Sequence, residues 1–91
     1  MIIEFTAHAC EEFEYWIDSD PDIASKIKDL IKSVRQTPFQ GLGKPEGLKH
    51  DLKGFWSRRI SDEHRLVYKI SGTKGQDQKC SIVQCRFHYD D

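Results

Sequence analysis

Several basic side chains and one isolated acid lie close together in the middle of this sequence, between Gly43 and Tyr68. The acid is Glu46, and its neighbours are lysines, arginines and histidines (Lys44, Lys49, His50, Lys53, Arg58, Arg59, His64 and Arg65). A carboxylate among cations suits chemistry on a phosphodiester, because cations favour its ionised form and bind phosphate oxygens. A late segment, CRFHY at 85–89, adds another histidine and a tyrosine.

These residue types match general acid–base cleavage of RNA. That reaction needs a base for the 2′-hydroxyl, cations for the charge growing on phosphate, and an acid for the leaving 5′-oxygen. Glu46 is the candidate base, and Arg59 and Arg65 are candidate phosphate ligands, because a planar guanidinium binds two oxygens at once. His88 is the candidate acid because histidine titrates near neutral pH. Tyr89 could stack on an unpaired base, as aromatic side chains commonly do in RNA recognition.

The acid and the arginines each have a structural alternative. On spacing alone, a solvent-exposed loop acid is the commoner role for a glutamate such as Glu46. Arg58, Arg59 and Arg65 also fit exposed strand residues in surface ion pairs, which contribute only about 0–1 kcal/mol each.

The histidines and tryptophans have similar alternatives. His50 and His64 flank turns, where histidines are commonly solvated, and His88 is close to the chain end. Trp16 and Trp56 fit core aromatics, although Trp56 is near enough to the basic run to serve as a stacking surface.

Length and charge limit the architecture and leave the partner open. Ninety-one residues predict one domain with a thin core. The formal net charge is −1, but residues 1–35 carry eight acids against four bases, and residues 44–69 carry seven lysines and arginines against four acids. An acidic half joined to a basic half predicts a polyanion-binding face that the net charge conceals.

The cysteines and the hydropathy pattern indicate a cytoplasmic protein. Cys10, Cys80 and Cys85 are odd in number and lack metal-binding spacing, so we expect buried or half-buried free thiols in a reducing compartment, and no metal or cofactor. The first residues lack the basic region of a signal peptide, and no apolar run approaches the roughly 20 residues of a membrane span.

The N-terminal third predicts a strand and two helices. Residues 1–5 are β-branched and aromatic, and Thr6 is a plausible N-cap for a helix from Ala7 to about Asp18. Asp20-Pro21 starts a second helix, which ends near Gln36. The expected apolar face of the first helix is Ala9, Cys10, Phe13, Trp16 and Ile17, with Glu11, Glu12 and Glu14 mostly on the other face.

The remainder predicts a loop followed by three strands. Glycines and prolines between 39 and 54 exclude a long regular element, and Phe39, Leu42, Leu48 and Leu52 are expected to anchor this loop to the body. Strands are expected at 55–60, 65–70 and 79–89, joined as an antiparallel meander with one face against the helices. The predicted fold is α+β, in the order β-α-α-β-β-β, with two helices packed on an antiparallel sheet.

Long motifs in this chain closely resemble the YoeB/Txe family of toxins, in the RelE/ParE superfamily. They are GKPE, LKH, GFWSRRI, EHRLVY and the late CRFHY, and the similarity also includes EYWIDSD and the TPF after the second helix. The resemblance implies a RelE-like fold and an mRNA interferase that cleaves mRNA in the ribosomal A site. It places the catalytic roles on Glu46, Arg65 and His88, and substrate binding on Lys49, His50, Arg59 and Tyr89.

The resemblance also implies partners. Members of this kind form homodimers, act on mRNA in the 70S ribosome and are silenced by a cognate YefM-like antitoxin. Two alternatives remain open. One is a non-catalytic ParE-like module that binds a protein such as gyrase, since fold alone does not determine function. The other is a decayed toxin whose remaining role is to bind its antitoxin.

Overall fold

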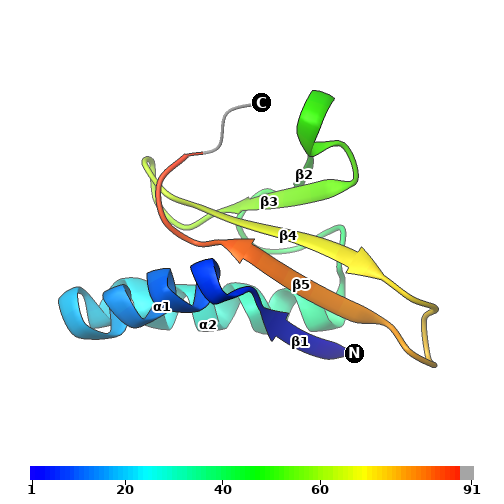
Figure 1. Cartoon of the computed structure of the whole chain (residues 1–91), viewed down its shortest axis with the longest axis horizontal. Helices are drawn as coiled ribbons and strands as arrows, with labels where there is room; N and C mark the ends of the chain where they lie inside the picture. The colour runs from blue at the N-terminus through cyan, green and yellow to red at the C-terminus, as the bar shows by residue number, and fades with distance from the viewer. Residues whose placement is uncertain (89–91) are drawn as a thin grey trace.

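The fold is a five-stranded sheet with two helices along one face (Figure 1). The structure, a computed structural model, describes residues 1–88. The elements are β1 (Ile2–Phe5), α1 (Ala7–Ser19), α2 (Pro21–Gln36), β2 (Glu46–Gly47), the 3-10 helix η1 (His50–Leu52), β3 (Phe55–Arg59), β4 (Arg65–Ser71) and β5 (Lys79–Gln84). The predicted α+β order is confirmed, and β2 and η1 are short additions within the predicted loop.

The sheet has the strand order β1-β5-β4-β3-β2. The predicted meander of β3, β4 and β5 is confirmed as antiparallel, and β2 adds to its edge in the same sense. At the other edge β1 runs parallel to β5, with Ile3 opposite Cys80, so the sheet is mixed and not antiparallel throughout. A parallel pair needs a long connection, and here the chain from α1 to β4 provides it.

Both helices begin at the capping residues that the sequence predicted. The Thr6 hydroxyl accepts a hydrogen bond from the Ala9 N–H at 3.1 Å, and the Asp20 carboxylate accepts one from the Ile23 N–H at 3.4 Å. Each bond satisfies one backbone donor that has no partner within the helix. Pro21 follows Asp20 at the first helical position, where its missing N–H costs nothing.

The core lies between the helices and the central strands. The α2 side chains Ile27, Leu30 and Val34 are buried against Leu66 and Tyr68 of β4. Among residues 1–88, neither helix is long and apolar enough to cross a membrane.

The buried face of α1 differs from the predicted one. Cys10 and Ile17 are exposed, while Glu12 is only 9% exposed. Its carboxylate accepts a hydrogen bond at 2.9 Å from the backbone N–H of Cys85, so a distant segment provides the partner that makes burial of this acid tolerable. Hydrophobic periodicity carries no information about such a partner, and the prediction for Glu12 was therefore wrong.

The last strand is shorter than predicted and ends at Gln84. A register shift disturbs its pairing with β4 between Val67 and Tyr68. Beyond it the Gln84 side-chain amide donates to the carbonyls of Arg86 and Phe87, at 3.0 and 3.2 Å. Phe87 then takes a φ of 65°, in the left-handed region, which ends any extended strand.

Arg58 is the largest fully buried side chain, which contradicts the expectation of an exposed surface ion pair. Among residues 1–88, no carboxylate accepts a hydrogen bond from its guanidinium. It donates instead to five neutral acceptors: the Tyr68 hydroxyl (3.0 Å), the Ser33 hydroxyl (2.7 Å) and the carbonyls of Leu42 (3.1 Å), Thr37 (2.7 Å) and Gln40 (2.6 Å). Arg58 therefore ties the chain after α2 to the sheet.

Candidate active site

The sheet face opposite the helices brings together three of the seven predicted site residues, Glu46, Arg59 and Arg65. Residues directly opposite each other on neighbouring strands share a face, and alternate residues along a strand share it too. Glu46 pairs with Ser57, and Arg59 pairs with Arg65. Because Ser57 and Arg59 are two apart on β3, Glu46, Arg59 and Arg65 belong to one face. Arg58 belongs to the other.

Glu46 is exposed on the two-residue strand β2 at the edge of the sheet. The Leu48 side chain that follows is buried, as predicted, and its N–H donates to the Phe55 carbonyl at 2.9 Å. Phe39 and Leu42 were predicted to be anchors too, but both are largely exposed. The loop is held through backbone carbonyls that bind Arg58, which hydrophobicity alone does not reveal.

Arg65 is the first residue of β4 and is only 7% exposed. Its Nη1 donates to the carbonyls of Ser61 (2.6 Å), His64 (3.0 Å) and Asp62 (3.3 Å). These bonds fix the guanidinium against the β3–β4 turn, so it is not the exposed surface residue that spacing alone allowed. The remaining N–H groups of a guanidinium are on Nε and Nη2, and these are the ones that a phosphate could use.

Three further predicted residues lie on the β2–β3 side of the molecule and are exposed. Arg59 ends β3, and its backbone N–H donates to the Gly43 carbonyl at 2.7 Å, which fixes the start of the segment leading to Glu46. Lys49 precedes η1, and His50 begins it with a φ of 56°.

His88 is exposed and follows Phe87, whose carbonyl accepts a hydrogen bond from the Arg65 N–H at 3.1 Å. The segment after β5 thus turns back over the start of β4, beside the β3–β4 turn (Figure 1). We had expected the last strand to carry the candidate acid, but an irregular segment beyond β5 carries it instead. Tyr89 lies outside the described residues.

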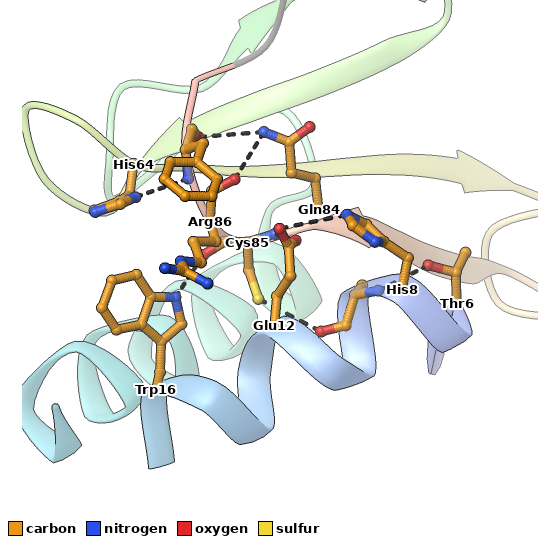
Figure 2. A network of polar contacts seen from close by, with 10 residues as sticks. Thr6, His8, Glu12, Trp16, His64, Gln84, Cys85 and Arg86 are labelled. Carbon is orange, nitrogen blue, oxygen red and sulfur yellow. Dashed lines mark hydrogen bonds and ion pairs between the residues drawn. The ribbon is translucent and has the colours of Figure 1, made fainter. Parts of the chain in front are cut away.

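A network of polar contacts holds this C-terminal segment, defined here as residues 85–88, against α1 (Figure 2). Cys85 is held at both ends of its backbone, because Glu12 accepts from its N–H and the Trp16 indole N–H donates to its carbonyl at 2.8 Å. The Arg86 guanidinium lies over the Tyr15 ring, 3.6 Å from its centroid. Sequence reasoning missed Glu12, although Glu12 and Trp16 are four residues apart and so share a helix face.

A groove of about 400 Å³ runs between α1 and the C-terminal segment. Its lining includes Glu12 and Tyr15 from the helix, and Arg86 and His88 from the segment. Its mixture of acids and bases does not define one ligand class.

The two buried thiols are not available as nucleophiles. Burial raises the pKa of Cys80 and of Cys85 to about 12, so both stay protonated at neutral pH. Cys10 is exposed, in contrast to the prediction, and all three cysteines are free. Within residues 1–88, no three histidine, cysteine or acidic side chains are grouped to hold a metal ion.

Comparisons with known proteins agree with this fold. Residues 5–89 match the family model described as the YoeB-like toxin of bacterial type II toxin–antitoxin systems. Toxin YoeB of Escherichia coli K12 is 47% identical over 89 residues, covering 98% of this chain and all of the relative. A YoeB/ParE toxin structure from Agrobacterium tumefaciens superposes with a TM-score of 0.92 at 47% identity, covering 98% of this chain and 100% of that one.

A second similar structure is the YoeB–YefM complex from Staphylococcus aureus, in which the matched chain has a TM-score of 0.85 at 37% identity, with 98% of each chain covered. The fold therefore corresponds to the class of small α+β toxins with two helices on one face of a sheet. The chain belongs to the YoeB-like toxin family of bacterial type II toxin–antitoxin systems.

Proposed function

We propose that this toxin is an mRNA interferase, an endoribonuclease that cuts mRNA in the A site of the 70S ribosome and so arrests translation in the cytoplasm. The observation that carries the proposal is the shared sheet face of Glu46, Arg59 and Arg65. His88 directly follows Phe87, whose carbonyl accepts a hydrogen bond from the Arg65 N–H. A gyrase-binding module has no need for a candidate base and two candidate phosphate ligands on one face.

The reaction proceeds by attack of the 2′-oxygen on the neighbouring phosphorus. Glu46 takes the 2′-hydroxyl proton, and Arg65 binds the phosphoryl oxygens as their negative charge grows. The bond from phosphorus to the 5′-oxygen then breaks, and His88 gives its proton to that oxygen. The products are a 2′,3′-cyclic phosphate and a free 5′-hydroxyl, and the step needs no metal or cofactor.

The other predicted residues act in substrate binding. Lys49 and His50 are exposed and close to Glu46 in sequence, and Arg59 is exposed on the neighbouring strand β3. The charges of Lys49 and Arg59 would bind RNA phosphates without reading sequence, and His50 would donate a hydrogen bond to one. Tyr89 would stack on the base next to the cut.

The partners proposed for this toxin are a YefM-like antitoxin, a second copy of itself and the ribosome with its mRNA. The Staphylococcus aureus relative has been solved in complex with YefM and also as a dimer. The basic sheet face that would bind RNA would also bind an acidic antitoxin segment, because both ligands are polyanions.

Cleavage of a defined mRNA on purified 70S ribosomes, mapped by primer extension, tests the proposal. Glu46→Gln, Arg65→Lys and His88→Gln each remove one role, and Glu14→Gln, an exposed acid on α1, is the matched control. Loss of a general acid or base is expected to slow cleavage by about 10²–10⁴-fold. Parental rates in all three site variants would refute the assignment. Arrest of DNA replication before translation on expression would favour the gyrase-binding alternative.

A further inference from the structure

Phe87 is held in an unfavourable backbone conformation by three hydrogen bonds. Its φ of 65° lies in the left-handed region, where bulky side chains are strained. Its N–H donates to Nδ1 of His64 at 2.7 Å, and its carbonyl accepts from the N–H of Arg65 and the side-chain amide of Gln84. Such a conformation persists only where the surroundings enforce it, so these bonds decide where the chain goes next.

His64 is rigidly placed, in contrast to the solvated turn histidine that its position suggested. Its ring packs edge-on against the Trp16 indole, with 4.7 Å between centroids, and lies 5.8 Å from the Phe87 ring (Figure 2). Its backbone N–H donates to the Ser61 hydroxyl at 3.2 Å, within the β3–β4 turn. Nδ1 can accept a hydrogen bond only when it carries no proton, so this bond requires the tautomer that has its proton on Nε2.

We propose that His64 is a positioning residue for the proposed reaction. By accepting the Phe87 N–H, it holds Phe87 at positive φ and so sets the direction in which His88, the next residue, leaves the C-terminal segment. Without this acceptor the N–H turns to water, φ relaxes to an ordinary negative value, and the His88 imidazole moves away from the 5′-oxygen. The inference rests on the proposed function, because it assigns to His88 the role of acid.

Two substitutions of His64 distinguish loss of the hydrogen bond from loss of the imidazole ring. His64→Asn places the side-chain oxygen close to where Nδ1 lies, and so keeps an acceptor for the Phe87 N–H. His64→Ala removes it. Gln84→Leu removes the side-chain donor at the other end of Phe87 and provides a second route to the same effect if His64→Ala does not fold.

A change of leaving group isolates the acid step. A short synthetic mRNA can carry sulfur in place of the bridging 5′-oxygen at the cut phosphate. The leaving group is then a thiolate, which needs no proton because thiols have a pKa of only about 8.5. With the oxygen substrate on 70S ribosomes, His64→Ala is expected to lower kcat on the order of 10²-fold with little change in KM. With the sulfur substrate its kcat should return to within a few-fold of the parent, and His64→Asn should resemble the parent on both.

Three outcomes would overturn the proposal. The first is parental cleavage of the oxygen substrate by His64→Ala. The second is an equal slowing on both substrates, as expected for Glu46→Gln, because that would mean a loss of more than acid positioning. The third is a His64→Asn enzyme as slow as His64→Ala.

Amide hydrogen exchange of the Phe87 N–H, measured by NMR, tests the hydrogen bond without any reaction. Exchange is expected to accelerate at least about tenfold in His64→Ala and to stay parental in His64→Asn. Unchanged exchange in His64→Ala would overturn the inference. If the parent protein cleaves neither substrate, the proposed function fails, and the exchange result still shows whether His64 holds Phe87.

Discussion

Replacing Arg58 with methionine tests whether a buried cation holds the loop that leads to the active site. Arg58→Met keeps an unbranched stem of similar length but removes the charge and the five hydrogen bonds. The three backbone carbonyls lie on a surface loop that water can reach. The hydroxyls of Ser33 and Tyr68 are buried, and each loses a charged donor.

The expected cost follows from the bonds lost at these two buried hydroxyls, each of which keeps another partner: Ser33 still accepts from the Leu42 N–H, and Tyr68 still donates to the Pro38 carbonyl. A hydrogen bond to a charged group contributes about 1.5–3 kcal/mol. Removing the buried charge also removes the cost of its desolvation, which offsets part of this loss. Replacing whole buried ion pairs by apolar side chains is often neutral or stabilising for the same reason. Because Arg58 goes and its partners stay, we expect a net loss of about 3 kcal/mol. A domain of this size unfolds at a cost of about 5–14 kcal/mol, and its Tm should fall by about 12–24 °C.

Urea unfolding followed by tryptophan fluorescence, at one fixed protein concentration, measures this loss. The matched control is Arg59→Met, the next residue on β3, which is exposed and should change stability by no more than about 0.5 kcal/mol. Arg58→Lys keeps a charge but lacks the planar fork, so it should fall between the two. A loss for Arg58→Met within about 1 kcal/mol of the control would refute the reasoning. A gain in stability would mean that desolvation of Arg58 outweighs its hydrogen bonds.

Two other predictions concern the thiols and the glycine turns. Ellman's reagent should titrate Cys10 in the native protein, and Cys80 and Cys85 only after unfolding. Burial raises the pKa of both buried thiols from 9.0 to about 12. The stability that they contribute is therefore complete below about pH 9 and is lost as pH rises towards 12. Urea unfolding from pH 8 to 11 should show this loss, and the loss should be smaller in Cys80→Ala. Gly43→Ala should cost more than Gly75→Ala in the same assay. Both glycines have φ near +80° (82° and 81°), but only at Gly43 would the new methyl meet other atoms, one of them a leucine methyl at 2.7 Å. Equal costs would mean that backbone strain alone matters.

Local features of the fold were predictable from the sequence, because their causes are local. Thr6 and Asp20 cap the helices through bonds to residues three positions away, and the meander follows from period-two alternation. The parallel pairing of β1 with β5 was not predictable, because nothing in residues 2–5 identifies their partner. Likewise, burial of Glu12 depends on Cys85, seventy-three residues away.

The candidate site was predictable in its residue types but only partly in its geometry. Strand parity alone relates Arg59 to Arg65, once β3 and β4 are paired. The place of His88 depends on Phe87, a strained residue whose conformation no propensity favours. A histidine in a turn gives no sign that a backbone N–H from another segment will bind it, and so the role of His64 emerges only from the fold.

The two neighbouring arginines of β3 show how one short strand organises the site from both faces. Arg58 has Trp56 and Ile60 at two-residue spacing, so the sequence held a parity signal for the apolar side that the prediction of an exposed Arg58 did not use. From there its guanidinium holds the chain after α2, while the Arg59 backbone holds Gly43 on the way to Glu46. The position of the proposed base thus depends on a side chain that never meets substrate. Charge density along the sequence pointed to this strand, and strand parity separates the arginine that supports the loop from the one that we propose binds RNA.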